Sequence, residues 1–71
     1  MIKRIIWLVE DPKKYDYVTV DRDGFVCGWV TTYSPYVGNS GIWWNNKGYI
    51  SAMIGECEYE GNWRELIWRM K

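Results

Sequence analysis

The sequence predicts an α+β fold, in which a small antiparallel sheet of about four or five strands packs against one C-terminal helix. Two stretches, residues 15–33 and 41–59, alternate β-branched or aromatic residues with smaller or polar ones around turns rich in Asp, Asn and Gly. Residues 62–71 instead combine a helix-start signal with apolar residues at helical spacing. With 71 residues, the chain is expected to form a single domain over residues 1–71.

The first strand is expected over residues 3–10, where KRIIWLVE is a nearly continuous apolar run rich in Ile. The segment DPKK then ends it with a turn. The first hairpin follows over residues 15–33. Its turn, DRDG at residues 21–24, is typical of a type I turn closed by a left-handed glycine, and this turn pairs Val20 with Val26.

Two features are expected to interrupt the strands. Residues 34–41, SPYVGNSG, gather Ser, Pro, Gly and Asn and are predicted to form an exposed loop, in which Tyr36 and Val37 are the apolar members. Gly55 lies inside a strand pattern and is predicted to mark a bulge or bend.

The second hairpin is expected over residues 41–59, with its turn at the segment NKG. In that register Trp44 pairs with Ile50 and Trp43 pairs with Ser51. Because side chains alternate along a strand, the two neighbouring tryptophans point to opposite faces of the sheet.

The closing helix is expected over residues 62–71. Asn62 is the predicted N-cap, and Glu65 nearly completes a capping box. The apolar residues of this segment fall at positions i, i+3, i+4 and i+7, which predicts one buried stripe. The stripe consists of Trp63, Leu66, Ile67 and Met70.

The faces of the two hairpins differ in character. One face is aliphatic and is expected to receive the helix, which places Trp44 in the core. The other face is aromatic and partly polar, and Trp43 belongs to it. An open aromatic platform and a sheet curled into a small barrel, with part of this aromatic set inside, are the two alternatives. The platform would comprise Tyr17, Trp29, Trp43 and Tyr49.

The predicted helix also has an outward-facing tryptophan. Trp68 follows Trp63 by five residues, roughly 140° around a helical wheel, and so points away from the buried stripe. Arg64 lies one turn before Trp68 and can stack on its indole. Trp and Arg are enriched at binding hot spots, although Trp68 could equally cover a loop or the first strand.

Surplus aromatic residues predict a binding surface, because six Trp and six Tyr exceed what one small core needs. An acidic row is the alternative contact face, and is otherwise a solvated strand face that discourages edge pairing. The residues expected to contact a partner are Trp68, Arg64, Trp43, Trp29, Tyr17, Tyr49 and Tyr36. The acidic row consists of Glu56, Glu58 and Glu60.

Composition argues against several classes of function. The chain has no histidine and no recognisable nucleophile, metal or phosphate-loop motif, so it is not expected to be an enzyme or to hold a metal or cofactor. Its formal net charge of zero disfavours a nucleic-acid coat protein. No apolar run is long enough to span a membrane. Cys27 and Cys57 are expected to be free, reduced thiols in a cytoplasmic protein.

Three segments, VTVDRDGFVCGW, GIWW and YEGNWRELI, together resemble a class of small accessory proteins of tailed bacteriophages. The resemblance implies a cytoplasmic viral protein that binds and inhibits a host enzyme or an anti-phage defence complex by protein–protein contact, without catalysis. The positions that carry it are Asp21, Asp23 and Gly24 of the hairpin, Trp43 or Trp44, and Asn62, Trp63 and Arg64.

Other partners stay open at this point. A small signalling nucleotide could be sequestered on the aromatic surface, provided that cations converge there. A single nucleic-acid strand could stack on the same rings, and a second copy of the chain could cover them. The candidate cations are Arg22, Lys47, Arg64 and Arg69.

Overall fold

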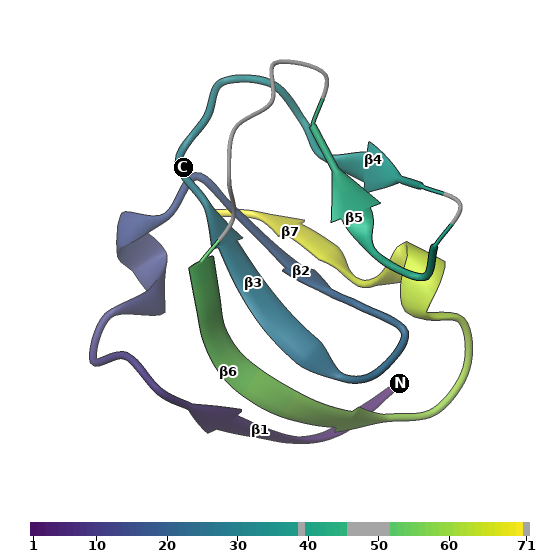
Figure 1. Cartoon of the computed structure of the whole chain (residues 1–71). Coiled ribbons are helices and arrows are strands. Elements are labelled where there is room, and N and C mark those ends of the chain that lie inside the picture. Colours follow the sequence, from purple (N-terminus) through teal and green to yellow (C-terminus); the bar gives the residue numbers. More distant parts are fainter. Residues whose placement is uncertain (39, 46–51, 71) are drawn as a thin grey trace.

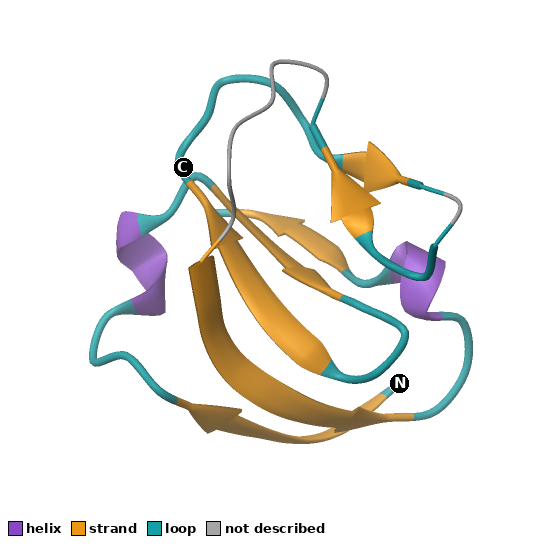
Figure 2. Cartoon of the chain, viewed as in Figure 1, coloured by secondary structure: helices purple, strands orange, loops and turns teal. Residues whose placement is uncertain are grey.

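The computed structural model describes residues 1–38, 40–45 and 52–70, and these residues form strands joined by turns (Figure 1, Figure 2). The strands of the main sheet are β1 (Ile2–Trp7), β2 (Tyr17–Val20), β3 (Phe25–Trp29), β6 (Ala52–Tyr59) and β7 (Ile67–Arg69). A second, two-stranded sheet consists of β4 (Tyr36–Val37) and β5 (Trp43–Trp44). Two short 3-10 helices, η1 (Pro12–Lys14) and η2 (Trp63–Glu65), complete the described elements.

The main sheet is antiparallel throughout, with the strand order β1-β6-β3-β2-β7. Figure 1 shows it strongly curled, with β1 and β7 at its two borders. The curl allows one five-stranded sheet to wrap around its own aliphatic residues without a covering helix.

The predicted α+β class is wrong, because no C-terminal helix forms: the described part of the chain is all-β. The predicted cap is real, since Asn62 accepts a hydrogen bond from the Arg64 N–H, but η2 ends at Glu65. Residues 67–69 then pair with β2 as β7. A ten-residue helix is marginal in water, whereas pairing as a strand satisfies the backbone and places Ile67 against the sheet.

The first hairpin is confirmed. Val20 faces Val26 across β2 and β3, and the Asp21 N–H donates to the Phe25 carbonyl at 3.0 Å. Gly24 has a φ of +90°, the left-handed conformation that the turn requires. The expected first strand also exists, but it ends at Trp7 instead of residue 10.

Gly24 is further constrained by its neighbour in space. Its carbonyl accepts from the Cys57 N–H at 2.7 Å, and a Cβ at Gly24 would lie 2.5 Å from the Cys57 carbonyl oxygen. The hairpin turn is therefore packed backbone to backbone against β6. The predicted bulge in β6 is confirmed as well, since the β3–β6 register shifts beside Gly55.

The inner side of the curled sheet holds an aliphatic core. Apolar residues of β1 and of the segment after it pack against this core, and so do the residues that directly precede and follow β7. The curl therefore buries apolar side chains from both ends of the sheet. Its fully buried members are Val18, Val20, Val26 and Ile54. Those packed around them are Ile5, Val9, Tyr15, Cys57, Tyr59, Leu66 and Met70.

The outer side of β2, β3 and β7 holds a second, aromatic cluster. Its centre is three buried tryptophans, of which Trp43 and Trp63 meet edge to face with ring centroids 6.3 Å apart. The sheet β4–β5 and η2 supply Trp43 and Trp63 and so cover this side of the main sheet. The cluster consists of Trp29, Trp43 and Trp63, with Tyr17, Val37, Tyr59, Leu66 and Ile67 around them.

The predicted places of the two neighbouring tryptophans are reversed. Trp43 is 6% exposed and belongs to the core, whereas Trp44 is 46% exposed. The reason is the partner strand: β5 pairs with β4, in the segment predicted to be a loop, and this small sheet folds back over the aromatic side. The expected pairing with residues 50 and 51, and the turn at 46–48, lie outside the described residues.

No helix in the described part of the chain has the length and apolar character needed to cross a membrane.

Candidate functional site

The sheet β4–β5 has one buried and one exposed face. Tyr36 faces Trp44 across the two strands, and Val37 faces Trp43. Val37 and Trp43 point into the aromatic cluster. Because neighbouring residues alternate, Tyr36 and Trp44 point the other way, and each is 46% exposed.

The exposed face continues one step beyond the two strands. The Gly38 N–H donates to the Ile42 carbonyl at 3.0 Å, which extends the same pairing. Ile42 is also exposed. Tyr36, Gly38, Ile42 and Trp44 therefore form one contiguous surface, which we call the outer hairpin face.

Gly38 leaves room for the Trp44 ring. A Cβ at position 38 would lie 1.8 Å from Cδ1 and 1.9 Å from Nε1 of the Trp44 indole. Contacts of this length are impossible, so the indole can rest here only because residue 38 has no side chain. The Trp44 indole therefore packs against the backbone at residue 38 while about half of the residue stays exposed.

Several hydrogen bonds attach this small sheet to the rest of the molecule. The Trp43 indole donates to the Val20 carbonyl at 2.9 Å, and the Trp43 N–H donates to the Asp21 carboxylate at 3.1 Å. The Arg22 N–H donates to the Gly41 carbonyl at 3.0 Å. The Asn45 amide donates to the Tyr33 carbonyl at 2.7 Å. The outer hairpin face is consequently fixed to the main sheet from several sides.

Asp21 is the charged group at this attachment. Its carboxylate accepts from the Trp43 N–H and from the Cys27 thiol, whose sulfur lies 3.6 Å away. Burial raises the pKa of Asp21, and the nearby Asp23 charge adds to this, while the two hydrogen bonds oppose the rise. The ionised form of Asp21 is therefore less favourable in the folded protein than in water, although its carboxylate helps to position the small sheet.

Several residues predicted to bind a partner are part of the core. Trp29 is buried and its indole donates to the Thr19 hydroxyl at 3.0 Å, so it is unavailable for contact. Trp43 is buried for the reasons given above, and Tyr17 is half-buried in the aromatic cluster. The open aromatic platform is therefore wrong. Tyr49 lies outside the described residues, and Tyr36 lies on the outer hairpin face.

The predicted pair of Trp68 and Arg64 does not form. Trp68 lies on β7, opposite Val18, and is 38% exposed. The Arg64 guanidinium instead stacks over the Trp63 ring, 5.0 Å from its centroid. The helical spacing that would have joined them is lost because the segment turns into a strand after η2.

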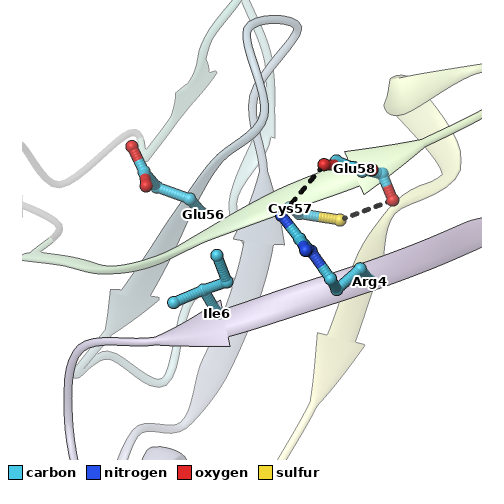
Figure 3. A pocket seen from close by; sticks show the side chains of 5 residues that line it. All are labelled: Arg4, Ile6, Glu56, Cys57 and Glu58. Atoms are coloured by element: carbon cyan, nitrogen blue, oxygen red, sulfur yellow. Dashed lines mark hydrogen bonds and ion pairs between the residues drawn. The ribbon is translucent and has the colours of Figure 1, made fainter.

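The acidic row lies on β6 and on the residue that follows it, and basic residues of β1 neutralise most of it. Arg4 pairs with Glu58 at 3.1 Å and Lys3 pairs with Glu60 at 2.7 Å. Figure 3 shows Arg4 and Ile6 of β1 beside Glu56, Cys57 and Glu58 around a shallow hollow. The row is therefore mostly a set of cross-strand ion pairs.

Cys57 in the same hollow is a poor nucleophile. Burial raises the pKa of its thiol, and the charge of Glu58 raises it further, so the thiol keeps its proton at neutral pH. Both Cys57 and Cys27 are free thiols. Among the described residues, no three metal-ligating side chains are grouped to hold an ion.

The cations considered for an anionic ligand lie apart from one another. Arg22 lines a hollow beside the first hairpin turn, while Arg69 lines another beside Thr31 and Thr32. Arg64 stacks on Trp63, and Lys47 lies outside the described residues. The described residues that line the hollow of the outer hairpin face carry no charge.

Three members of the outer hairpin face were not predicted as contact residues: Gly38, Ile42 and Trp44. A signal for them exists in the sequence. Tyr36 and Val37 are an apolar pair on one side of a Gly-rich segment of the sequence, with the two tryptophans at matching distance on the other side. Treating residues 36–44 as a short hairpin of their own would have placed Trp44 opposite Tyr36.

No protein-family model matches this chain, and no curated protein or solved structure matches it either.

Proposed function

We propose that this chain is a non-catalytic binding protein whose outer hairpin face grips a protein partner. The observation that carries the proposal is the exposed Tyr36–Trp44 pair, in which the Trp44 indole packs against the backbone at Gly38. Tyrosine and tryptophan contribute most at interfaces when they are rigid and partly apolar. A fixed pair loses little conformational entropy on binding.

A protein fits this face better than a nucleotide or a nucleic-acid strand. Phosphate groups require nearby cations, and the described lining of this hollow has none. Arg69 lines another part of the surface and Arg64 stacks on Trp63, so of these arginines only Arg22, whose guanidinium packs against Gly41, lies beside the small sheet. The sheet face expected to stack bases is covered. An uncharged aromatic face instead complements an apolar patch on a folded protein.

The identity of the partner rests on a separate line of support. The resemblance to bacteriophage accessory proteins points to a host enzyme or an anti-phage defence complex in the bacterial cytoplasm, inhibited by occupation of its surface. The described part of the chain has no membrane-spanning helix, which is compatible with such a setting.

The experiment compares the purified protein with three variants in a pull-down from bacterial lysate, followed by calorimetric titration of the recovered protein. Trp44→Ala should weaken the affinity by ~2 kcal/mol, roughly thirtyfold, and Tyr36→Ala should weaken it in the same direction. Gly38→Ala should do so too, because the added methyl displaces the indole.

Trp68→Ala is the matched control, since it removes the same side chain from an exposed position on β7. It should leave the affinity unchanged. Circular dichroism and urea unfolding show whether each variant is folded. Folded Trp44→Ala and Tyr36→Ala variants that bind like the wild type would refute the proposal, and so would a wild type that retains no protein beyond what Trp44→Ala retains.

A further inference from the structure

The border strand β1 presents an apolar edge. It pairs with β6 on one side, and no other described strand pairs with it (Figure 1). Along this edge Ile6 and Trp7 are exposed, and Leu8, the next residue, is 57% exposed. Proteins usually protect such an edge, because unpaired backbone groups beside apolar side chains invite another strand.

The backbone groups of β1 alternate in direction. The Leu8 N–H donates to the Ile54 carbonyl at 2.9 Å, so Leu8 and Ile6 turn their backbone groups toward β6. In an antiparallel ladder the residues that alternate with them, Ile5 and Trp7, direct theirs the other way. These groups face the open side and can pair with an incoming strand.

When residues 3–11 of two copies are aligned antiparallel, the residues that face each other match in polarity and charge. A two-fold axis through such a pair requires one residue to face its own counterpart. With Trp7 at the axis, Ile6 faces Leu8 and Ile5 faces Val9, so apolar residues meet apolar residues. Arg4 then faces Glu10, and Lys3 faces Asp11, so that basic residues meet acidic ones.

Other arrangements lose this match. With Ile6 at the axis, Arg4 would face Leu8 and Lys3 would face Val9, which places charges against apolar side chains. In a parallel pair the basic ends would meet each other. We infer that two copies of this chain associate through β1, antiparallel and centred on Trp7, to form a continuous sheet across the dimer.

The inferred contact is independent of the outer hairpin face. β1 ends at Trp7 in the single chain, and residues 8–10 bend there. In the dimer these residues extend the strand, so that Glu10 reaches Arg4 of the other copy. Arg4 keeps its ion pair with Glu58 on its own β6, because its side chain is 63% exposed and can serve both carboxylates.

Sedimentation equilibrium of the full chain at increasing concentration tests this inference. The wild type should show a monomer–dimer equilibrium. Glu10→Arg should raise the dissociation constant by about tenfold or more, because Arg then faces Arg. The double variant Arg4→Glu with Glu10→Arg should restore association by exchanging the two charges. Glu65→Arg, the same charge change on the exposed surface of η2, should have no effect.

Each outcome decides the matter. A wild type that stays monomeric at ~0.5 mM, far above what a specific dimer needs, would overturn the inference. So would a dimer that Glu10→Arg leaves intact, or one that Glu65→Arg weakens equally. If Trp44→Ala dissolves the dimer while Glu10→Arg does not, the copies meet through the outer hairpin face instead. Hydrogen exchange of the Trp7 amide gives a second readout, since pairing protects it as concentration rises.

Discussion

Exchanging each of the two adjacent tryptophans for phenylalanine separates a core residue from a surface one. Trp43→Phe removes the indole N–H that donates to the Val20 carbonyl at 2.9 Å inside the protein. Losing a buried hydrogen bond costs ~1–3 kcal/mol. The smaller ring also leaves unfilled space in the aromatic cluster beside Trp63, which adds to that cost. We therefore expect a loss of about 2 kcal/mol or more.

That loss is large for this molecule. A domain of this length has a free energy of unfolding of ~4–11 kcal/mol, so Trp43→Phe should lower the melting temperature by roughly 8 °C or more. Trp44→Phe should change the stability by less than ~0.5 kcal/mol, because that ring is half in water. Urea unfolding followed by far-ultraviolet circular dichroism measures both without depending on tryptophan emission. Equal midpoints for the two variants, or a larger loss for Trp44→Phe, would show that the faces of β5 are assigned the wrong way round.

Two further substitutions test the attachments of the hairpins. Because the pKa of Asp21 is raised in the folded state, its contribution to stability is most favourable at low pH and is lost as the pH rises through that pKa. Asp21→Asn should therefore be at least as stable as the wild type near pH ~7, with an advantage that shrinks toward pH ~4. Urea midpoints of both proteins across this range test it, and a stability of the variant relative to the wild type that is lower at neutral pH than in acid would contradict the assignment. Gly24→Ala should destabilise the protein well beyond the ~1–2 kcal/mol expected for a left-handed alanine, because the new methyl meets the Cys57 carbonyl oxygen. Gly61→Ala is the matched control, with a φ of +96° but nothing closer than 3.7 Å to the added atom, and a similar midpoint for the two variants would show that the backbone contact at Gly24 is unimportant.

The local features of this fold could be predicted from the sequence where short-range chemistry determines them. The turn at residues 21–24 fixes the register of β2 and β3, because Gly24 can adopt the left-handed conformation and the alternation around it is regular. The Asn62 cap and the bulge beside Gly55 were found in the same way. Each of these depends on residues within a few positions of one another.

The long-range pairings could not be predicted in this way. The spacing of Trp63, Leu66, Ile67 and Met70 suits a helix, but Ile67 and Trp68 suit a strand equally well. The strand forms because β2 has a free edge with which residues 67–69 can pair. The same is true of Trp44, whose exposure depends on which strand β5 pairs with. The candidate site was only partly predicted for this reason, since Tyr36 was named while Trp44 was assigned to the core.

The order of strands in the main sheet also governs how the chain reaches this fold. Among the described strands of that sheet, only β2 and β3 are neighbours both in sequence and in space, so their hairpin is the part that can form early. β1 can pair only with the distant β6, and β7 can pair only with the distant β2. Each of these pairings closes a long loop, and the entropy lost in closing it is compensated only after the contacts form. A fold this small is therefore expected to form slowly for its size. During that delay the tryptophans of the aromatic cluster are open to other unfolded chains, which makes dilute conditions the favourable ones for refolding.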